Sequence, residues 1–101
     1  MKNINGKELR EIVAKNTDAV IIDVRTEDEI RSGMIEGAIN YNLTGSSFAD
    51  DIKVLDKSKT YLMVCRSGNR SGSACGFMEK EGFQNVYNLD GGMMNWDGQT
   101  V

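Results

Sequence analysis

Histidine is absent from this 101-residue sequence, and so is proline. Without histidine, the chain can form neither a Cys–His nor a Ser–His catalytic pair, and two cysteines are too few for an ordinary zinc site. The longest apolar runs, residues 19–22 and 61–65, are far shorter than the roughly 20 residues that cross a bilayer. The first ten residues also lack the apolar segment of a secretory signal. We therefore expect a cytoplasmic protein that does not bind a membrane.

The composition is that of an ordinary folded domain, with 40% hydrophobic and 27% charged residues. Its length predicts a single domain over residues 1–101. The net charge of -3 argues against a nucleic-acid partner, because phosphate binding needs an excess of basic residues on one face. In a reducing cytosol the two cysteines, Cys65 and Cys75, are expected to be free thiols.

Patterns typical of strands and helices alternate along the chain. Residues 19–24 form a short, branched, apolar run, which indicates a strand buried on both faces. Asn5 with Glu8, and Thr26 with Glu29, have the spacing of helix-capping boxes. Further strands are expected over 38–43, 60–64 and 85–89, and further helices over 47–55 and 71–81. This alternation predicts an α/β domain with a mainly parallel sheet and helices on both faces.

Asp23 and Cys65 each lie at the carboxyl end of a predicted strand, which is where parallel sheets bind ligands. A cysteine reacts as its thiolate, whose formation is favoured near cations and helix N-termini. Arg66 and Arg70 flank the loop that follows Cys65. Gly68 adopts left-handed backbone conformations readily and Asn69 does so more often than most residues, so the loop is expected to fold its N–H groups into an anion-binding nest. We therefore expect an ionised, exposed sulfur inside a ring of amides.

The loop Cys-Arg-Ser-Gly-Asn-Arg-Ser, residues 65–71, resembles the active-site loop of the rhodanese family of sulfurtransferases. Residues 22–25 (IDVR) resemble that family's first central strand, and residues 33–40 (GMIEGAIN) resemble a segment usually written GHIPGAIN. Residues 89–92 (LDGG) with Trp96 resemble its C-terminal motif. The resemblance covers the whole chain in order. It implies a rhodanese-like fold with a central, mainly parallel five-stranded sheet and helices on both faces.

The resemblance also implies a reaction in which Cys65 is the catalytic nucleophile. It would take a sulfane sulfur from thiosulfate or another persulfide donor, and pass it to a thiophilic acceptor such as cyanide, a thiol or a protein thiol. A thioredoxin-like protein or a persulfide carrier is a further candidate partner, and no metal or organic cofactor is expected. The residues implied to hold the outer sulfur are Arg66, Ser67, Gly68, Asn69, Arg70 and Ser71.

Two residues depart from the family pattern, because Met34 and Glu36 stand where the family often has histidine and proline. One alternative function is a non-catalytic rhodanese-like module that binds a partner protein, although such modules often lack the cysteine. A Cys-based phosphatase or arsenate reductase is less favoured, because Arg70 follows Cys65 after four residues rather than five. Cys75 is either a resolving thiol or a core residue of its helix, and its spacing favours the core.

Overall fold

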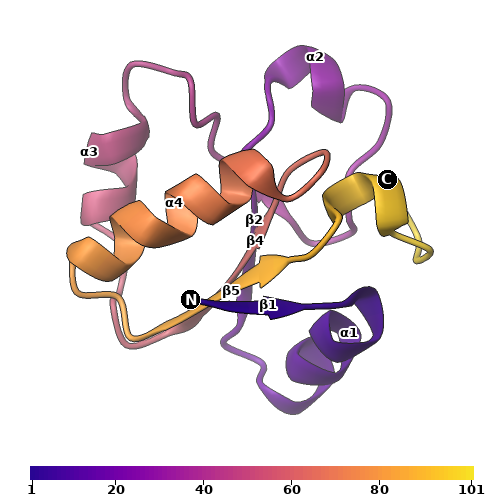
Figure 1. The fold of residues 1–101 in the computed structure, drawn as a ribbon, viewed down its shortest axis with the longest axis horizontal. Coiled ribbons are helices and arrows are strands. Elements are labelled where there is room, and N and C mark those ends of the chain that lie inside the picture. Colours follow the sequence, from indigo (N-terminus) through magenta and orange to yellow (C-terminus); the bar gives the residue numbers. More distant parts are fainter.

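The computed structural model describes residues 1–101 and contains a five-stranded sheet flanked by helices (Figure 1). The strand order is β1-β5-β4-β2-β3 and every neighbouring pair is parallel, so the predicted α/β architecture is confirmed. None of the helices has the length and apolar character of a membrane span. The elements are β1 (Lys2–Ile4), α1 (Gly6–Lys15), β2 (Val20–Asp23), α2 (Glu27–Ile30), β3 (Ile39–Asn40), α3 (Phe48–Lys53), β4 (Thr60–Val64), α4 (Asn69–Lys80), β5 (Asn85–Leu89) and the 3-10 helix η1 (Gly92–Asn95).

Side chains of the central strand β4 point alternately into two apolar layers. Tyr61 and Met63 belong to the layer that contains residues of α3 and α4, whereas Leu62 and Val64 belong to the layer that contains Leu9 of α1. Figure 1 shows α3 and α4 on one side of the sheet and α1 on the other. Burial on both faces explains why this strand is apolar without alternation.

Two helices begin where the capping-box spacing predicts. In α1 the Asn5 side chain accepts the N–H of Glu8 at 2.8 Å, and the Glu8 carboxylate accepts the N–H of Asn5 at 3.0 Å. In α2, Thr26 and Glu29 exchange the same pair of bonds at 3.3 and 3.2 Å. A cap of this kind stabilises a helix by about 1 kcal/mol. The short helix α2 thereby fixes the position of Glu29, which also pairs with Arg70 at the start of α4.

Three elements differ from the sequence-based prediction. Strand β1 was not predicted, because three residues with one buried side chain show no strand period. Strand β3 is limited to Ile39–Asn40 within the predicted range 38–43. Helix α4 begins at Asn69, two residues before the predicted start, and follows Gly68, whose φ is +101°. Gly68 is therefore left-handed as expected, whereas Asn69 is helical and the expectation for it was wrong.

Candidate active site around Cys65

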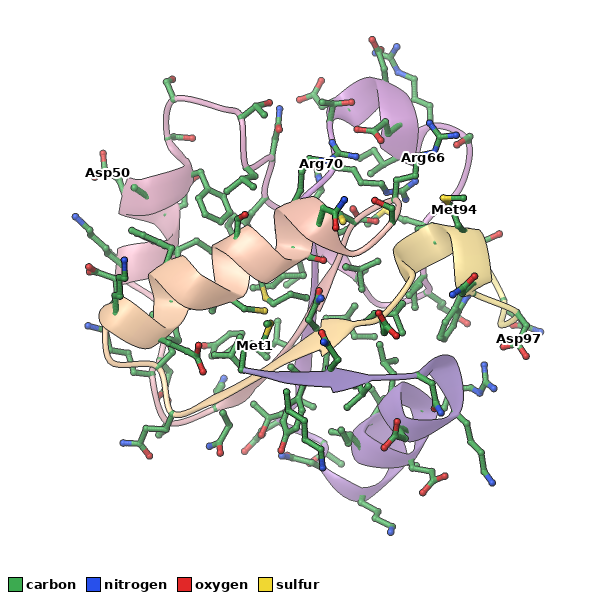
Figure 2. The ribbon with its side chains drawn as sticks, in the orientation of Figure 1. Met1, Asp50, Arg66, Arg70, Met94 and Asp97 are labelled. Atoms are coloured by element: carbon green, nitrogen blue, oxygen red, sulfur yellow. The ribbon has the colours of Figure 1, made fainter.

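Cys65 follows strand β4, which lies between β2 and β5 near the middle of the sheet. The next three residues form a tight loop, and α4 then begins at Asn69. Figure 2 shows Arg66 on this loop, Arg70 at the start of α4, and Met94 of η1 beside them, above the end of the sheet. The fold thus places a thiol at the carboxyl end of a central strand and at the N-terminal end of a twelve-residue helix.

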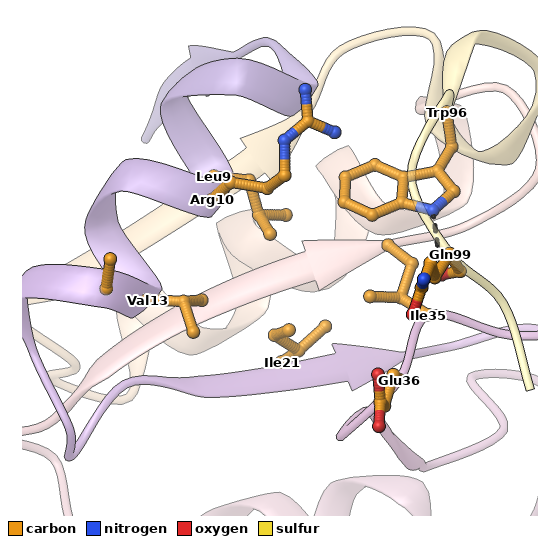
Figure 3. Close-up of a pocket in the computed structure, with 9 residues that line it drawn as sticks. Leu9, Arg10, Val13, Ile21, Ile35, Glu36, Trp96 and Gln99 are labelled. Carbon is orange, nitrogen blue, oxygen red and sulfur yellow. Dashed lines mark hydrogen bonds between the residues drawn. The ribbon is translucent and has the colours of Figure 1, made fainter.

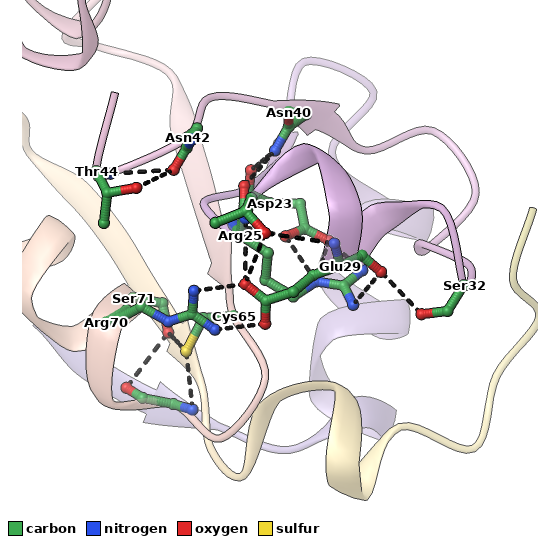
Figure 4. Close-up of polar contacts among 12 residues, drawn as sticks. Asp23, Arg25, Glu29, Ser32, Asn40, Asn42, Thr44, Cys65, Arg70 and Ser71 are labelled. Atoms are coloured by element: carbon green, nitrogen blue, oxygen red, sulfur yellow. Dashed lines mark hydrogen bonds and ion pairs between the residues drawn. The ribbon is translucent and has the colours of Figure 1, made fainter. Parts of the chain in front are cut away.

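The Cys65 sulfur receives hydrogen bonds from its own loop. The N–H of Gly68 donates to Sγ at 3.0 Å, and the hydroxyl oxygen of Ser71 lies 3.3 Å from Sγ (Figure 4). Burial alone raises the pKa of the Cys65 thiol. Hydrogen bonds from the Ser71 hydroxyl and from the N–H groups of Ser71, Gly68 and Ser67 outweigh that effect, so the pKa lies below its ordinary value. The loop therefore favours the thiolate through short-range donors.

The expectation of an exposed sulfur was wrong, because Cys65 has 0% of its surface exposed. Its side chain belongs to the apolar layer that contains residues of α3 and α4. Two hollows flank the loop. One, of about 390 Å³, lies among Arg66, Glu29 and Met94, and the other, of about 440 Å³, is bordered by the loop and by polar side chains of β1 and β5. Cys65 itself lines neither hollow.

Arg70 is held in an ion pair, although attraction to Cys65 is also among the causes that raise the pKa of Arg70. Its guanidinium forms two hydrogen bonds to the Glu29 carboxylate, both 2.7 Å long (Figure 4). This ion pair lowers the pKa of Glu29 to about 2 and raises the pKa of Arg70. Arg66, in contrast, is exposed and forms no ion pair. Sequence analysis treated the two arginines alike, because the partner of Arg70 lies 41 residues away in the chain.

The Glu29–Arg70 pair predicts a specific loss of stability in acid. The pKa of Glu29 is lower in the folded protein than its ordinary value of 4.5. The ion pair therefore stabilises the fold fully at pH values above 4.5, and this stabilisation is lost as the pH falls toward about 2. In Glu29→Gln this pH-dependent contribution should be missing. Thermal unfolding measured across that interval should therefore show a flatter decline of Tm for the variant than for the wild type.

Glu27→Gln is the matched control for this experiment, because Glu27 lies on the same short helix but is exposed and forms no ion pair. It should keep the wild-type slope of Tm against pH. Parallel curves for all three proteins would show that the Glu29–Arg70 pair contributes nothing to folding.

The segment after β5 also supports the loop. The N–H groups of Met93 and Met94 donate to the carbonyl oxygens of Cys65 and Arg66, at 2.9 and 3.0 Å. Gly92 lies directly against that backbone, because a Cβ at this position would be 2.3 Å from the Cys65 carbonyl oxygen. The two consecutive glycines of the LDGG motif thus allow η1 to hold the cysteine loop in place.

Asp23, the other residue at the predicted sheet edge, is part of the scaffold. It is 0% exposed and forms a buried ion pair with Arg25, with 2.8 Å between Oδ2 and Nη2 (Figure 4). Arg25 also donates to the carbonyl oxygen of Gly33 at 2.8 Å, and the Asn40 amide donates to the Asp23 and Arg25 carbonyl oxygens at 2.9 Å. This network ties the end of β2 to β3 and to the segment around α2, which carries Glu29.

Cys75 is buried in the core on α4, as its spacing predicts. Its Sγ lies 3.7 Å from the carbonyl oxygen of Tyr87. Burial, together with the nearby negative charge of Glu79, raises the pKa of Cys75 to about 12. The two cysteines therefore have opposite electrostatic environments, and only that of Cys65 favours the reactive anion.

An apolar cavity of about 340 Å³ lies away from the cysteine loop, between α1 and the C-terminal segment (Figure 3). Its walls include Leu9, Ile21, Ile35 and Trp96, which belong to the apolar layer on the α1 side of the sheet. Cys65 belongs to the opposite layer. This cavity is therefore separate from the site around the thiol.

The family model for the rhodanese-like domain matches residues 5–99 of this chain. The chain belongs to this family. A putative sulfurtransferase of Bacillus subtilis, YtwF, is 36% identical over 100 residues, which cover 99% of this chain and 94% of that protein. The thiosulfate sulfurtransferase GlpE of Pseudomonas entomophila is 40% identical over 78 residues, covering 77% of this chain and 70% of the relative.

Solved structures of rhodanese-like domains share the fold. The rhodanese-like domain protein of Staphylococcus aureus superimposes with a TM-score of 0.86 at 29% identity, covering 100% of this chain and 97% of that chain. A rhodanese-related protein of Thermoplasma volcanium also gives 0.86 at 29% identity, with coverage of 100% and 98%. The rhodanese-like fold implied by the sequence motifs is thus confirmed.

Within this rhodanese-like domain, the six residues predicted to hold the outer sulfur fall into different environments. Ser67, Gly68 and Ser71 supply the donors that lower the pKa of Cys65. Asn69 and Arg70 form the start of α4, and Arg66 points to solvent. Sequence analysis missed Asn88, which is buried beside Ser71. An amide in a strand where apolar residues are expected was the available signal.

Proposed function

We propose that this protein is a sulfurtransferase that carries a sulfane sulfur on Cys65 as a persulfide. The observation that supports this most strongly is the set of N–H and O–H donors around Sγ, which lower the pKa of a thiol that burial alone would raise. A thiolate is the nucleophile in sulfur exchange, and relatives of this chain are named sulfurtransferases. The proposed localisation is the cytoplasm.

The proposed donor half-reaction uses thiosulfate. The Cys65 thiolate attacks the outer sulfur, a new S–S bond forms, and the bond between the outer sulfur and the sulfonate sulfur breaks. Sulfite leaves with the electron pair of that bond, and Cys65 remains as a persulfide. In the second half-reaction cyanide, a thiol or a protein thiol attacks the outer sulfur, and the Cys65 thiolate leaves. No external oxidant or reductant is required in either step.

The loop is suited to an anionic sulfur at both stages. N–H groups fixed by the fold stabilise negative charge without reorganising, which is usually the largest contribution to catalysis at such sites. The N-terminus of α4 adds the positive end of a helix dipole. We assign the binding of the outer sulfur to the loop from Arg66 to Ser71. The exposed Arg66, beside the 390 Å³ hollow, is the cation available to attract an anionic donor.

Intact-mass measurement after thiosulfate treatment tests this proposal. The wild type should gain the mass of one sulfur atom and lose it when cyanide is added, with thiocyanate appearing in solution. Cys65→Ser should gain nothing. Cys75→Ala is the matched control, because it removes the other, buried thiol and should still form the adduct. An adduct that persists in Cys65→Ser, or no adduct in the wild type, would contradict the proposal.

A further inference from the structure

Asn88 is a buried polar residue in strand β5, with 5% of its surface exposed. Its strand lies between β1 and β4, and its side chain makes hydrogen bonds in three directions. The side-chain nitrogen donates to the Gly68 carbonyl oxygen at 3.1 Å and to the Asn3 side-chain oxygen at 3.0 Å. Its Oδ1 accepts the Ser71 hydroxyl at 2.5 Å. Asn88 therefore connects the sheet to the cysteine loop.

The orientation of this amide follows from chemistry. A backbone carbonyl cannot donate, so the end of Asn88 that faces Gly68 has to be the NH₂ group. Both hydrogens of that group are used by Gly68 and Asn3. The oxygen of Asn88 is left facing Ser71, and because an amide oxygen cannot donate, Ser71 has to be the donor in that contact.

Ser71 has one hydroxyl hydrogen and three acceptors within reach. Besides Asn88 Oδ1, these are Cys65 Sγ and the Gly68 carbonyl oxygen, each 3.3 Å from Ser71 Oγ. One hydrogen cannot serve all three acceptors. Beside a neutral thiol, the amide oxygen is the better acceptor. Beside a thiolate or a persulfide anion, the charged sulfur is the better acceptor, because hydrogen bonds to ionised groups are about twice as strong.

We propose that Asn88 is a positioning residue that makes Ser71 a two-position donor, whose hydrogen rests on Asn88 Oδ1 and turns to the Cys65 sulfur when that sulfur is anionic. The inference rests on the proposed function, because it names the group that responds as Cys65 gains and loses charge. The charged and titratable groups nearby are Arg70 with Glu29, Asp23 with Arg25, Cys75, and, around the hollow that Asn88 lines, Asp90 and the N-terminal amine of Met1. None of them hydrogen-bonds to Ser71 Oγ, so Asn88 is the side chain that competes with sulfur for its hydrogen.

A double-mutant cycle on the thiol pKa tests this role. Asn88→Asp places a charged acceptor beside Ser71 and should retain its hydrogen when Cys65 ionises. Losing one hydrogen bond to the thiolate should raise the pKa of Cys65 by about 1 to 2 units, which slows alkylation below that pKa at least about tenfold. In a Ser71→Ala background the added charge and the loss of the two donors to Gly68 and Asn3 remain, but the competition for the Ser71 hydrogen is gone. The same substitution should then produce less than half of that increase. The pH dependence of alkylation by iodoacetamide gives the pKa of Cys65 in all four proteins, namely the wild type, Asn88→Asp, Ser71→Ala and the double variant.

Asn85→Asp is the matched control, since it adds the same charge to an exposed position of β5 and should leave the alkylation profile unchanged. An equal increase for Asn88→Asp in both backgrounds would overturn the inference, because Asn88 would then act through charge or structure rather than through Ser71. Alkylation needs no sulfur transfer. If the effect of Asn88→Asp on the pKa of Cys65 depends on the Ser71 hydroxyl in a protein that forms no persulfide, this inference therefore stands while the proposed function fails.

A measurement on the unmutated side chain covers the case in which Asn88→Asp does not fold. The side-chain amide resonances of Asn88 should shift with pH in the wild type, with a midpoint equal to the pKa of Cys65 from alkylation. In Ser71→Ala the amplitude of that shift should fall below half. Resonances that do not respond to Cys65 ionisation, or respond equally without the Ser71 hydroxyl, would overturn the assignment.

Discussion

Thiosulfate-to-cyanide sulfur transfer should fall to the uncatalysed background in Cys65→Ser, a loss of at least about four orders of magnitude, as is typical when a nucleophile is removed. A serine hydroxyl does not ionise under conditions that ionise this thiol, and it cannot form a persulfide. The loop donors around Sγ remain in the variant, but they then have no sulfur to stabilise. Colorimetric detection of thiocyanate measures the rate.

Cys75→Ala should retain most of the wild-type rate, because the Cys75 thiol is buried and its pKa is raised to about 12. Loss of activity in Cys75→Ala without loss of folding would give Cys75 a role in the reaction. Turnover that survives in Cys65→Ser would remove Cys65 from the chemistry altogether.

Gly92→Ala should disrupt the cysteine loop and abolish the same activity. The added Cβ would lie 2.3 Å from the Cys65 carbonyl oxygen and 2.7 Å from the Arg66 backbone, and φ at Gly92 is +55°. Strain in this backbone region costs about 1 to 3 kcal/mol, and the clash with main-chain atoms adds to it. Thermal or denaturant unfolding should therefore show a loss of about 3 kcal/mol or more.

Gly37→Ala separates these two causes. Gly37 also has a positive φ, +86°, but a Cβ there would meet nothing within 4 Å. The free energy of unfolding of this control should fall by only about 1 kcal/mol, the cost of the strained backbone conformation, and its activity should be retained. If Gly92→Ala were no less stable or active than Gly37→Ala, the close packing of η1 against the loop would not be what holds the loop in place.

Most of the fold could be predicted from local patterns. The apolar runs that became β2 and β4 are strands buried on both faces, and the Asn5–Glu8 and Thr26–Glu29 spacings mark helix starts. These features depend on residues close together in the sequence. Strand β1 could not be found in this way, because its three residues are held in the sheet by pairing with β5 from the other end of the chain.

The position of Cys65 in the fold was predictable, but the electrostatics around it were not. Cys65 at a strand end and Gly68 in a left-handed turn follow from the sequence. The pairing of Arg70 with Glu29 and the burial of Asn88 beside Ser71 depend on contacts 41 and 17 residues apart. Sequence analysis attributed the stabilisation of the thiolate to backbone amides and to arginine charges. The structure adds the Ser71 hydroxyl to the Gly68 amide beside the sulfur, and shows that Arg70, whose charge also interacts with Cys65, is shared with Glu29.

A crystal structure of the protein after thiosulfate treatment tests the central claim most directly. The account predicts one additional sulfur bonded to Cys65 Sγ, with N–H groups of the loop from Ser67 to Ser71 within hydrogen-bonding distance of it. An unmodified Cys65, an additional sulfur on Cys75 instead, or a modified Cys65 whose loop N–H groups point to solvent would contradict the account.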